Sequence, residues 1–524
     1  MLRVSNIKIN ISLDQDKYIK KKLSSIFDQD IKEYKINKRS IDARHKPDIY
    51  YIYEIDIDVK NEKEYLDLGI ASEVFDEEYK IDQSKIKKSL KRPIIIGFGP
   101  AGIFCSYILA KAGLKPIIFE RGKQIDERIK DVEEFWKSNN LNINSNIQFG
   151  EGGAGTFSDG KLNTMIKEKI RQKFVFKTFV ECGAPEEILY LNKPHIGTDV
   201  LRTVIKNLRN KIIELGGEIH YNSCLTNINV DNNKIKSIVI NDQDEYETDD
   251  LVLAIGHSAR DTFKMLHNFL EMSPKPFAVG VRVQHKQDLI NKNQYGESYK
   301  LLPPADYKLT YQTKDGRGVY SFCMCPGGFV VNSSSENNRL CINGMSNHDR
   351  DEENANSAIV VTISPSDYGS DIFDGMKFQE MLENKAYIEG KRLIPVSLYK
   401  DYKLNQVSTS FGSIKPIFKG GYSFGNINNI FPEYINNSLK EAIDYFNTKI
   451  KGFNDDDTII AAVEARTSSP VRILRDDDLM SNIKGIYPCG EGAGYAGGIT
   501  SASIDGIKVA EAILLNWILQ SFDL

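Results

Sequence analysis

A glycine-rich turn between a short apolar strand and a helix restricts the possible fold of this chain more than any other feature. Residues 94–102 read Ile-Ile-Ile-Gly-Phe-Gly-Pro-Ala-Gly, and the apolar stretch 113–120 ends in Glu120. Such glycines permit a tight turn, close approach of the backbone to a pyrophosphate, and close packing of helix on strand. The helix predicted over 103–112 directs its first N–H groups at phosphate, and a carboxylate after the second strand binds a ribose. This βαβ unit therefore predicts dinucleotide binding. The expected contacts are Gly97, Gly99, Pro100, Ala101, Gly102, Glu120 and Arg121.

A second glycine motif near the end of the chain favours FAD over NAD. Residues 486–499 form a strand that runs into glycines and then a helix. Two-part sites of this kind are expected when a long ligand lies across a sheet. Residues 492–497 also match the dinucleotide spacing, but no second strand with a ribose-binding acid follows, so we expect no separate nicotinamide domain. NADH or NADPH stays open as an electron donor. The expected contacts are Gly490, Glu491, Gly498 and Ile499.

Seven further segments carry a resemblance to known flavoproteins. They are residues 38–44, 149–162, 194–199, 280–282, 320–328, 466–472 and 488–498. Over nearly its whole length the chain resembles the glutathione-reductase-type FAD fold, and more closely a family of uncharacterised FAD-dependent dehydrogenases of bacteria and plastids. The resemblance implies noncovalent FAD, with Leu225 beside the adenine and Gly256 near the phosphates. The alternative for Leu225 is a place in the strand core. Relatives with the general fold carry Asp beside the ribityl chain, where this chain has the longer Glu491.

A glycine-rich loop over 150–162 is the next candidate for cofactor binding. Its backbone is free enough to lie against a flat or phosphorylated ligand, although a plain flexible loop is the alternative. The resemblance implies that it wraps the pyrophosphate and the ring. Lys161 is the hypothesis for a positive charge that stabilises reduced, anionic flavin. The expected contacts here are Gly152, Gly153, Gly155, Thr156 and Lys161.

Four further residues join Lys161 as catalytic candidates. His195 titrates near neutrality and suits a proton donor, while the alternative is a histidine that bonds a loop carbonyl. Cys323 and Cys325 alternate on a predicted strand and are a candidate redox pair, with core packing as the alternative. The sequence has no second group of Cys and His residues at the spacing of a zinc site to accompany this pair, so we expect no metal site. Arg466 is a candidate for an anionic substrate, with ordinary ion pairing as the alternative. The same two interpretations apply to Arg282, Arg317, Arg472 and Arg475.

The order of these motifs predicts how the chain is divided. The expected fold is α/β: a Rossmann-like FAD-binding domain of glutathione-reductase type, split by an inserted α+β substrate domain and preceded by an α+β, ferredoxin-like module. The predicted units are residues 1–90 for the N-terminal module, 91–274 for the first part of the FAD domain, 275–455 for the inserted domain and 456–524 for the second part. The charged stretch 76–91 is predicted to be a linker or an exposed helix.

Function is expected to be hydride transfer through flavin N5 to or from an unidentified small molecule, with an anionic substrate as one class. A flavoenzyme acting on RNA is one alternative, because residues 38–46 form a locally basic turn; a solvated loop in which Asp42 bridges its arginines is the other interpretation of that turn. An electron-transfer or scaffold protein without a small substrate is the remaining alternative.

Composition narrows the class of protein. The 524 residues carry a formal net charge of −4 and are 41% apolar, which is typical of a soluble globular protein and unlike a basic nucleic-acid binder. No membrane span is expected, since glycines break the least charged stretch, 93–110, and the apolar segment 509–522 is too short. Seven cysteines and no recognisable secretory signal favour free thiols in the cytoplasm.

Overall fold

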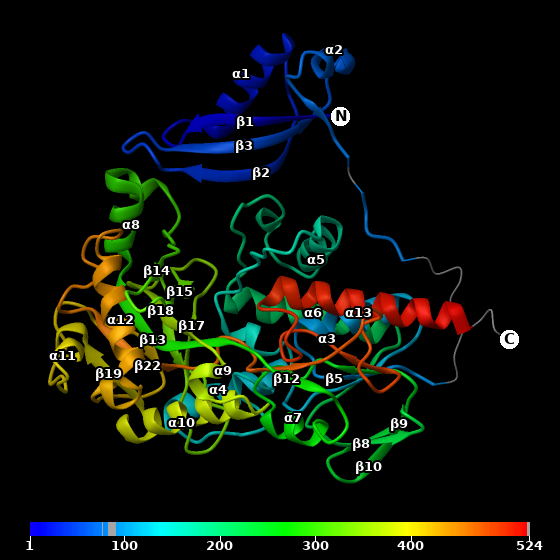
Figure 1. Cartoon of the computed structure of the whole chain (residues 1–524). Helices are drawn as coiled ribbons and strands as arrows, with labels where there is room; N and C mark the ends of the chain where they lie inside the picture. Colours follow the sequence, from blue (N-terminus) through cyan, green and yellow to red (C-terminus); the bar gives the residue numbers. More distant parts are fainter. Residues whose placement is uncertain (76, 82–90, 521–524) are drawn as a thin grey trace.

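The computed structural model describes residues 1–75, 77–81 and 91–520, and for 516–520 only the backbone (Figure 1). Most of the linker predicted over 76–91 lies outside the described residues. The chain builds a mixed α/β fold from parallel and antiparallel sheets. Within the described part, no helix is both long enough and apolar enough to cross a membrane.

The N-terminal module has the element order and sheet order expected of a ferredoxin-like unit. Its sheet runs β2-β3-β1-β4, and α1 buries Ile19, Leu23 and Phe27 against it. The α1 helix begins after Asp14, whose side chain accepts from the N–H of Lys17. The elements are β1 (Leu2–Asn10), α1 (Gln15–Phe27), β2 (Lys35–Asp42), β3 (Tyr50–Ile57), α2 (Glu62–Asp67) and β4 (Ser72–Glu73).

The basic segment over 38–46 is only partly the turn that the sequence predicts. Its first five residues complete β2, an edge strand, where charged side chains discourage pairing with another chain. The guanidinium of Arg44 donates to both carboxylate oxygens of Asp42 at 2.8 Å, so Asp42 binds this arginine without bridging it to Arg39. Arg39 lies between the rings of Tyr51 and Tyr190, so this arginine already has partners within the chain. The module thus lies against the rest of the protein near residue 190 and beside α8 (Figure 1).

After the N-terminal module, strands from the beginning and from the end of the remaining chain form one five-stranded parallel sheet. Its order is β24-β11-β5-β6-β7, and the buried isoleucines of β5 stand at its centre. The last helix, α13, packs along α3 (Figure 1). The predicted βαβ unit and the C-terminal strand therefore belong to one sheet. The elements are β5 (Ile94–Ile96), α3 (Pro100–Lys111), β6 (Ile117–Phe119), α6 (Thr198–Glu214), β7 (Glu218–His220), β11 (Leu251–Leu253), β24 (Ile486–Pro488) and α13 (Ile499–Gln520).

A small antiparallel sheet, β10-β9-β8, follows β7. Its strands β8 (Leu225–Asp231) and β10 (Asp244–Glu247) are rich in Asn, Asp or Glu, which strands generally disfavour. The hairpin between β8 and β9 (Lys234–Ile240) turns through Asn232 and Asn233, both with positive φ.

A seven-stranded sheet of mainly antiparallel pairs forms the second large core. Its order is β14-β15-β18-β13-β22-β19-β21. The strand β22 pairs with β13 and β19, which puts residues 459–464 in this sheet, beyond the boundary predicted at 455. The reason is that its apolar run is buried between two neighbours. The strands are β13 (Phe277–Lys286), β14 (Thr310–Gln312), β15 (Gly318–Cys325), β18 (Asn354–Ile363), β19 (Ile394–Leu398), β21 (Tyr422–Phe424) and β22 (Ile459–Glu464).

Shorter elements complete the two cores. The helices are α4 (Ile125–Ser138), η2 (Ala154–Phe157), α5 (Lys169–Glu181), η3 (Glu186–Leu189), α7 (Arg260–Leu266), α8 (Gln287–Tyr295), η4 (Gly296–Leu301), α9 (Pro365–Tyr368), α10 (Asp374–Glu389), α11 (Tyr399–Lys403), η5 (Ile427–Asn429) and α12 (Glu433–Phe446). The strands are β12 (Met272–Pro274), β16 (Phe329–Asn332), β17 (Ile342–Met345), β20 (Phe418–Lys419) and β23 (Val471–Ile473).

Candidate functional site

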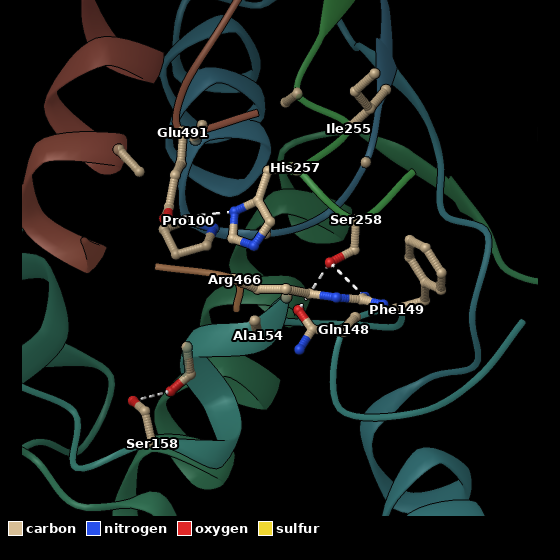
Figure 2. Close-up of a pocket in the computed structure, with 18 of the residues that line it drawn as sticks. Pro100, Gln148, Phe149, Ala154, Ser158, Ile255, His257, Ser258, Arg466 and Glu491 are labelled. Carbon is tan, nitrogen blue, oxygen red and sulfur yellow. Dashed lines mark hydrogen bonds and ion pairs between the residues drawn. The ribbon is translucent and has the colours of Figure 1, made fainter. Parts of the chain in front are cut away.

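A cavity of about 390 Å³ lies between the parallel sheet and the seven-stranded sheet (Figure 2). Both glycine motifs, the loop after β6 and the strand β15 contribute to its lining. Most of the residues that the sequence predicts as site residues meet here. They are Gly97, Gly99, Pro100, Ala101, Glu120, Arg121, Gly153, Gly155, Lys161, Leu225, Gly256, Cys323, Arg466, Glu491, Gly498 and Ile499.

The first glycine motif places the end of α3 at the cavity. Gly97 has a φ of +96°, and a Cβ there would lie 2.3 Å from the carbonyl oxygen of Ala254. In the described part of the chain no side chain caps α3, so its first turn presents backbone N–H groups toward the cavity. Gly102 does not line the cavity; a Cβ on it would lie 2.0 Å from the carbonyl oxygen of Gly97. Its role is close packing of helix on strand.

Glu120, at the end of β6, organises three backbone segments. One carboxylate oxygen accepts from the N–H of Phe98 at 2.8 Å, and the other accepts from Gly122 at 2.9 Å and Gly150 at 2.8 Å. The side chain is buried but still lines the cavity. The carboxylate can thus fix the glycine turn and still offer a lone pair to a ribose hydroxyl.

Arg121 and Leu225 lie toward the end of the cavity beyond β6. The guanidinium of Arg121 stacks over the ring of Phe149 at 4.8 Å and contacts the Cys224 thiol at 2.8 Å. Leu225 belongs to a buried apolar cluster, as the strand-core interpretation expects, and it also lines the cavity. The flat, partly apolar lining suits an adenine ring.

The glycine loop is shaped by a buried arginine that the sequence analysis did not find. The Arg128 guanidinium donates to the carbonyls of Asn146, Ile147, Glu151 and Gly153 at 2.7–3.0 Å. Burial lowers the pKa of Arg128 to about 10, which leaves it charged at neutral pH. The four carbonyls satisfy that charge and hold the loop in one shape.

Three other residues that the sequence predicts as cofactor contacts, Gly152, Thr156 and Gly490, make close packing contacts. Thr156 is buried, and a Cβ on Gly152 would lie 2.1 Å from its hydroxyl oxygen. Gly490 has positive φ, and a Cβ there would lie 2.7 Å from that of Ala101. In the described chain none of the three lines the cavity. The glycine pattern therefore identifies the site but does not tell packing glycines from ligand-facing ones.

His257 and Glu491 lie next to each other on the cavity lining, and a dashed line joins them in Figure 2. Nδ1 of His257 lies 3.4 Å from a carboxylate oxygen of Glu491. Its Nε2 is buried and has no hydrogen-bond partner within the described residues. A buried ring nitrogen of this kind is available to a polar group of a ligand. The sequence analysis singled out Glu491 but not His257.

Lys161 lines the cavity beside a buried aspartate. Its Nζ lies 3.7 Å from Asp159, which is held on its other side by Arg350 with an Nε–Oδ1 distance of 2.9 Å. Burial opposes the ionisation of Asp159, but Arg350 and Lys161 outweigh it and lower its pKa to about 2. A charged lysine thus borders the cavity in a fixed position.

His195 does not line the cavity, contrary to a role as a proton donor at the ring. It pairs with Lys161 through a backbone bridge, and its Nε2 lies 2.9 Å from the carbonyl oxygen of His348. Burial lowers its pKa to about 4. This is the loop histidine of the alternative interpretation. Cys325 is also buried behind the lining, whereas Cys323 reaches it.

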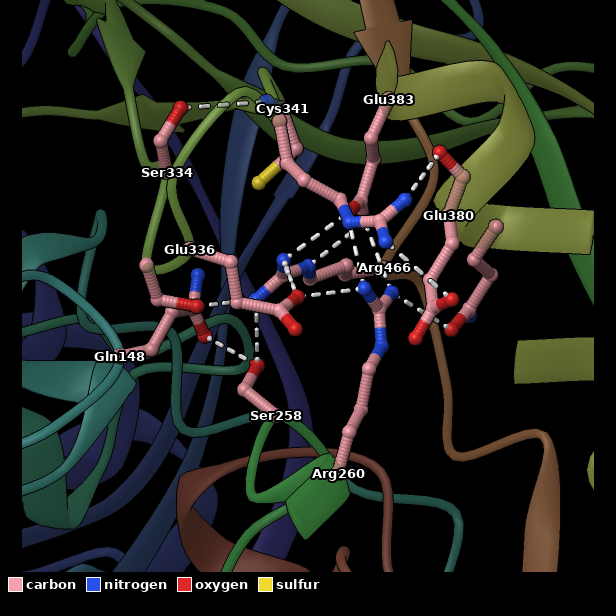
Figure 3. Close-up of polar contacts among 12 residues, drawn as sticks. Gln148, Ser258, Arg260, Ser334, Glu336, Cys341, Glu380, Glu383 and Arg466 are labelled. Atoms are coloured by element: carbon pink, nitrogen blue, oxygen red, sulfur yellow. Dashed lines mark hydrogen bonds and ion pairs between the residues drawn. The ribbon is translucent and has the colours of Figure 1, made fainter. Parts of the chain in front are cut away.

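Arg466 is held by a buried network rather than left free for an anion (Figure 3). It donates to Glu383, Ser258, Ser335 and Glu336 at 2.6–3.1 Å. Arg260 also donates to the carboxylates of Glu383 and Glu336, as Figure 3 shows. Burial opposes the charge on Glu383, but the two arginines lower its pKa to about 2.

The other arginines considered for an anionic substrate also have partners within the chain. Arg282 binds Glu464, Arg317 binds Asp367 and Arg475 binds Asp505. Arg472 lies over the ring of Tyr495. Ion pairing accounts for the first three.

Comparison with known proteins adds the family. A family model described as "FAD-dependent protein, C-terminal domain-like" matches residues 276–467, and a domain of unknown function matches residues 1–58. An uncharacterised protein of Clostridium beijerinckii is 47% identical over 544 aligned positions, covering 100% of this chain and 99% of that protein. The chain belongs to the same family as this Clostridium beijerinckii protein. FAD is its cofactor.

Solved structures resemble the chain only distantly. CtdE in complex with FAD and a substrate is 12% identical, with a TM-score of 0.36 over 83% of this chain and 84% of CtdE. The L-proline dehydrogenase of P. horikoshii is 12% identical, with a TM-score of 0.33 over 82% of this chain and 95% of the dehydrogenase. At these scores no role is carried over from either enzyme.

The residues present fit FAD. A Cβ on Gly256 or Gly498 would meet nothing within 4 Å, so both glycines border open space along the cavity. The bare N-terminus of α3, the carboxylate of Glu120 and the unpartnered Nε2 of His257 supply polar groups along the same path. A long ligand with a central pyrophosphate satisfies all of them.

Proposed function

We propose that the protein is an FAD-dependent oxidoreductase that passes a hydride to or from a small-molecule substrate. Bound FAD supplies hydride transfer through its N5 atom. The observation that carries the proposal is the mixed lining of the cavity. Lys161 and Cys323 join it from the glycine loop and the seven-stranded sheet, and Glu120 and Arg121 join it from the segment that follows β6. We also propose the finer fold, a glutathione-reductase-type FAD domain interrupted by the large sheet.

Glu120 and the end of α3 would hold the ribose and the pyrophosphate, as their positions after β6 and β5 suggest. On this assignment the isoalloxazine ring lies toward Lys161, Cys323 and Asn343. The seven-stranded sheet then covers the ring and excludes water from it.

Lys161 would stabilise negative charge that develops on the reduced ring. Its ammonium lies beside Asp159, and the ion pair of Asp159 with Arg350 keeps that carboxylate in place. Lys161 is also a candidate for binding an anionic substrate, since the arginines named for that role bind other groups.

NADH and NADPH are the first electron donors to test, because FAD proteins without a nicotinamide domain can still receive hydride from a diffusing donor. We further propose the cytoplasm as the compartment, since all seven cysteines are unbridged in the structure.

An anaerobic screen tests the function. Purified protein with bound FAD is mixed with metabolites of different charge, and with NADH or NADPH, while flavin absorption is followed. We expect at least one small molecule to reduce the flavin, seen as bleaching of its absorption, or to reoxidise it, at a rate that saturates with its concentration. If the flavin exchanges electrons only with protein carriers, the assignment of a small-molecule substrate is wrong and the protein is an electron-transfer protein.

A further inference from the structure

Two thiols on β15 stand at the wall of the cavity, and the proposed hydride transfer does not use them. Cys323 lines the cavity, and Cys325 is fully buried behind it. The residue between them, Met324, packs into the core of the seven-stranded sheet. One thiol is therefore accessible to a ligand and the other is not.

A β-bulge turns Cys323 toward the cavity. Phe322 pairs with Ala358 and Cys325 pairs with Asn356, so β15 holds one residue more than its partner strand between these pairs. Cys323 has a φ of 44°, in the left-handed region that residues other than glycine rarely adopt. Bulges re-aim side chains and are frequent beside active sites. The alternation that the sequence predicts for the two cysteines is interrupted here.

Two cations lie near the sulfurs, Arg282, which is paired with Glu464, and Lys161, which lies beside Asp159. Nη1 of Arg282 donates to the carbonyl oxygen of Cys323 at 3.0 Å. A Cβ on Gly344 would lie 2.2 Å from that Nη1 and 2.8 Å from the sulfur of Cys325, so the guanidinium and the inner thiol share the space over this glycine. Lys161 lies on the cavity side, and it also interacts electrostatically with Cys323.

The thiol of Cys325 donates to the backbone carbonyl oxygen of Cys323, with an Sγ–O distance of 3.4 Å. The neighbouring Cys325 lowers the pKa of Cys323, and Arg282 and Lys161 lower it further. The neighbouring Cys323 and burial raise the pKa of Cys325. One thiolate facing one thiol is the arrangement that disulfide formation requires.

The other cysteines lack this environment. Burial raises the pKa of Cys105, Cys182, Cys341 and Cys489, and it also raises that of Cys224, whose thiol contacts Arg121. The acidic thiol of the described chain is thus the one placed at the sheet side of the cavity.

We propose that Cys323 and Cys325 form a redox-active pair that exchanges two electrons with bound FAD. The inference rests on the proposed function, because it needs the flavin ring at this side of the cavity. When a bond forms between the two sulfurs, the Cys323 thiolate and the Cys325 thiol give up two electrons and the proton of Cys325. Oxidised FAD takes the two electrons and one proton and becomes the reduced anion. The reverse step reopens the disulfide.

An anaerobic dithionite titration counts the electrons. Wild-type protein with FAD, first oxidised in air, is expected to take up about four electrons per flavin, two for the flavin and two for the disulfide. Cys323→Ser and Cys325→Ser should each take up about two electrons. Cys182→Ser is the matched control, a buried thiol away from the cavity, and should behave as wild type.

A thiol measurement on the wild type needs no folded variant. Differential alkylation with mass spectrometry should find Cys323 and Cys325 joined in the air-oxidised protein and both alkylated after reduction. Free thiols at both positions in oxidised protein, with about two electrons taken up per flavin, would overturn the pair while leaving the oxidoreductase intact. A protein that binds FAD but whose flavin no small molecule reduces or reoxidises would instead contradict the proposed function.

Discussion

Glu120 accepts a hydrogen bond of 2.8 Å from the backbone N–H of Gly150, which ties the end of β6 to the first glycine of the following loop. The same carboxylate accepts from Phe98 in the first glycine motif. Two segments that the sequence treats as separate parts of a cofactor site are therefore held together by one side chain. The acid that the sequence predicts to bind a ribose is therefore also the organiser of the glycine loop.

Replacing Glu120 by Gln should weaken both the fold and FAD binding. The amide has one accepting oxygen, so a buried backbone N–H would face an NH₂ group at a cost of about 1–3 kcal/mol. We expect a lower thermal midpoint and roughly tenfold weaker FAD binding, measured by calorimetry. Glu218→Gln, at the exposed end of β7, is the control. Wild-type affinity in Glu120→Gln would show that the carboxylate does not shape the site.

Gly498→Val should block FAD while leaving the fold unchanged. A Cβ at Gly498 points into open space on the cavity lining, and the backbone there has no positive φ. We expect the purified variant to retain less than about a tenth of the wild-type FAD, with the thermal midpoint of the apoprotein unchanged. Gly318→Ala, on β15 away from the cavity, should retain FAD fully. Full occupancy in Gly498→Val would place the cofactor elsewhere.

Arg466→Lys separates a structural role from substrate binding. Lysine cannot reproduce the contacts of the guanidinium with Glu383, Glu336 and two serines, and loss of a buried pair costs about 3–5 kcal/mol. We expect a large fall in the thermal midpoint. Arg317→Lys, at a partly exposed pair, should change stability by less than about 1 kcal/mol. If the thermal midpoint of Arg466→Lys is unchanged and its KM is raised, Arg466 binds an anionic substrate instead.

Lys161→Gln should make the flavin harder to reduce. Without the ammonium the reduced anion loses stabilisation, and we expect the flavin potential to fall by on the order of 30 mV. The pH at which Cys323 is half alkylated should rise in the same variant, because Lys161 favours the thiolate. Lys193→Gln, an exposed lysine paired with Asp306, is the control. An unchanged flavin potential in Lys161→Gln would show that Lys161 does not lie close enough to the flavin ring to stabilise its charge.

Acid should destabilise the protein partly through His285. Burial lowers the pKa of His285 to about 4, against an ordinary value near 6.5. Between these values the unfolded chain binds a proton that the folded chain does not, so stability falls as pH falls, by up to about 1.4 kcal/mol per pH unit. His285→Gln, which keeps a donor for the carbonyl of Phe453, should reduce the loss of thermal midpoint between pH 7 and 5. The exposed His45→Gln should leave that loss unchanged.

Sequence patterns predicted the parts of the fold that are local. The strand, turn and helix around Gly97 follow from neighbouring residues, and so does Glu120 at the end of β6. The helix α6 likewise begins where Thr198 opens an amphipathic pattern. These elements need no knowledge of distant contacts.

The rest depends on residues that are far apart along the chain. Arg466, Arg260 and Glu383 are far apart along the chain and meet only in the folded protein. The residues around Arg466 in the sequence therefore could not show that its guanidinium is hydrogen-bonded to carboxylates of this protein. Arg128 acquires its role from carbonyls of a later loop. The direction of Cys323 depends on a bulge against β18, which no spacing of cysteines reveals.

The flavin content of the purified protein is the most direct test of the cofactor site. We expect one FAD per chain, released on denaturation without a covalent link, and lost in Gly498→Val. Bound FAD should also be protected by the cavity, so that removing it lowers the thermal midpoint. A folded wild-type chain that carries no flavin and does not take up added FAD would contradict the assignment of the cavity.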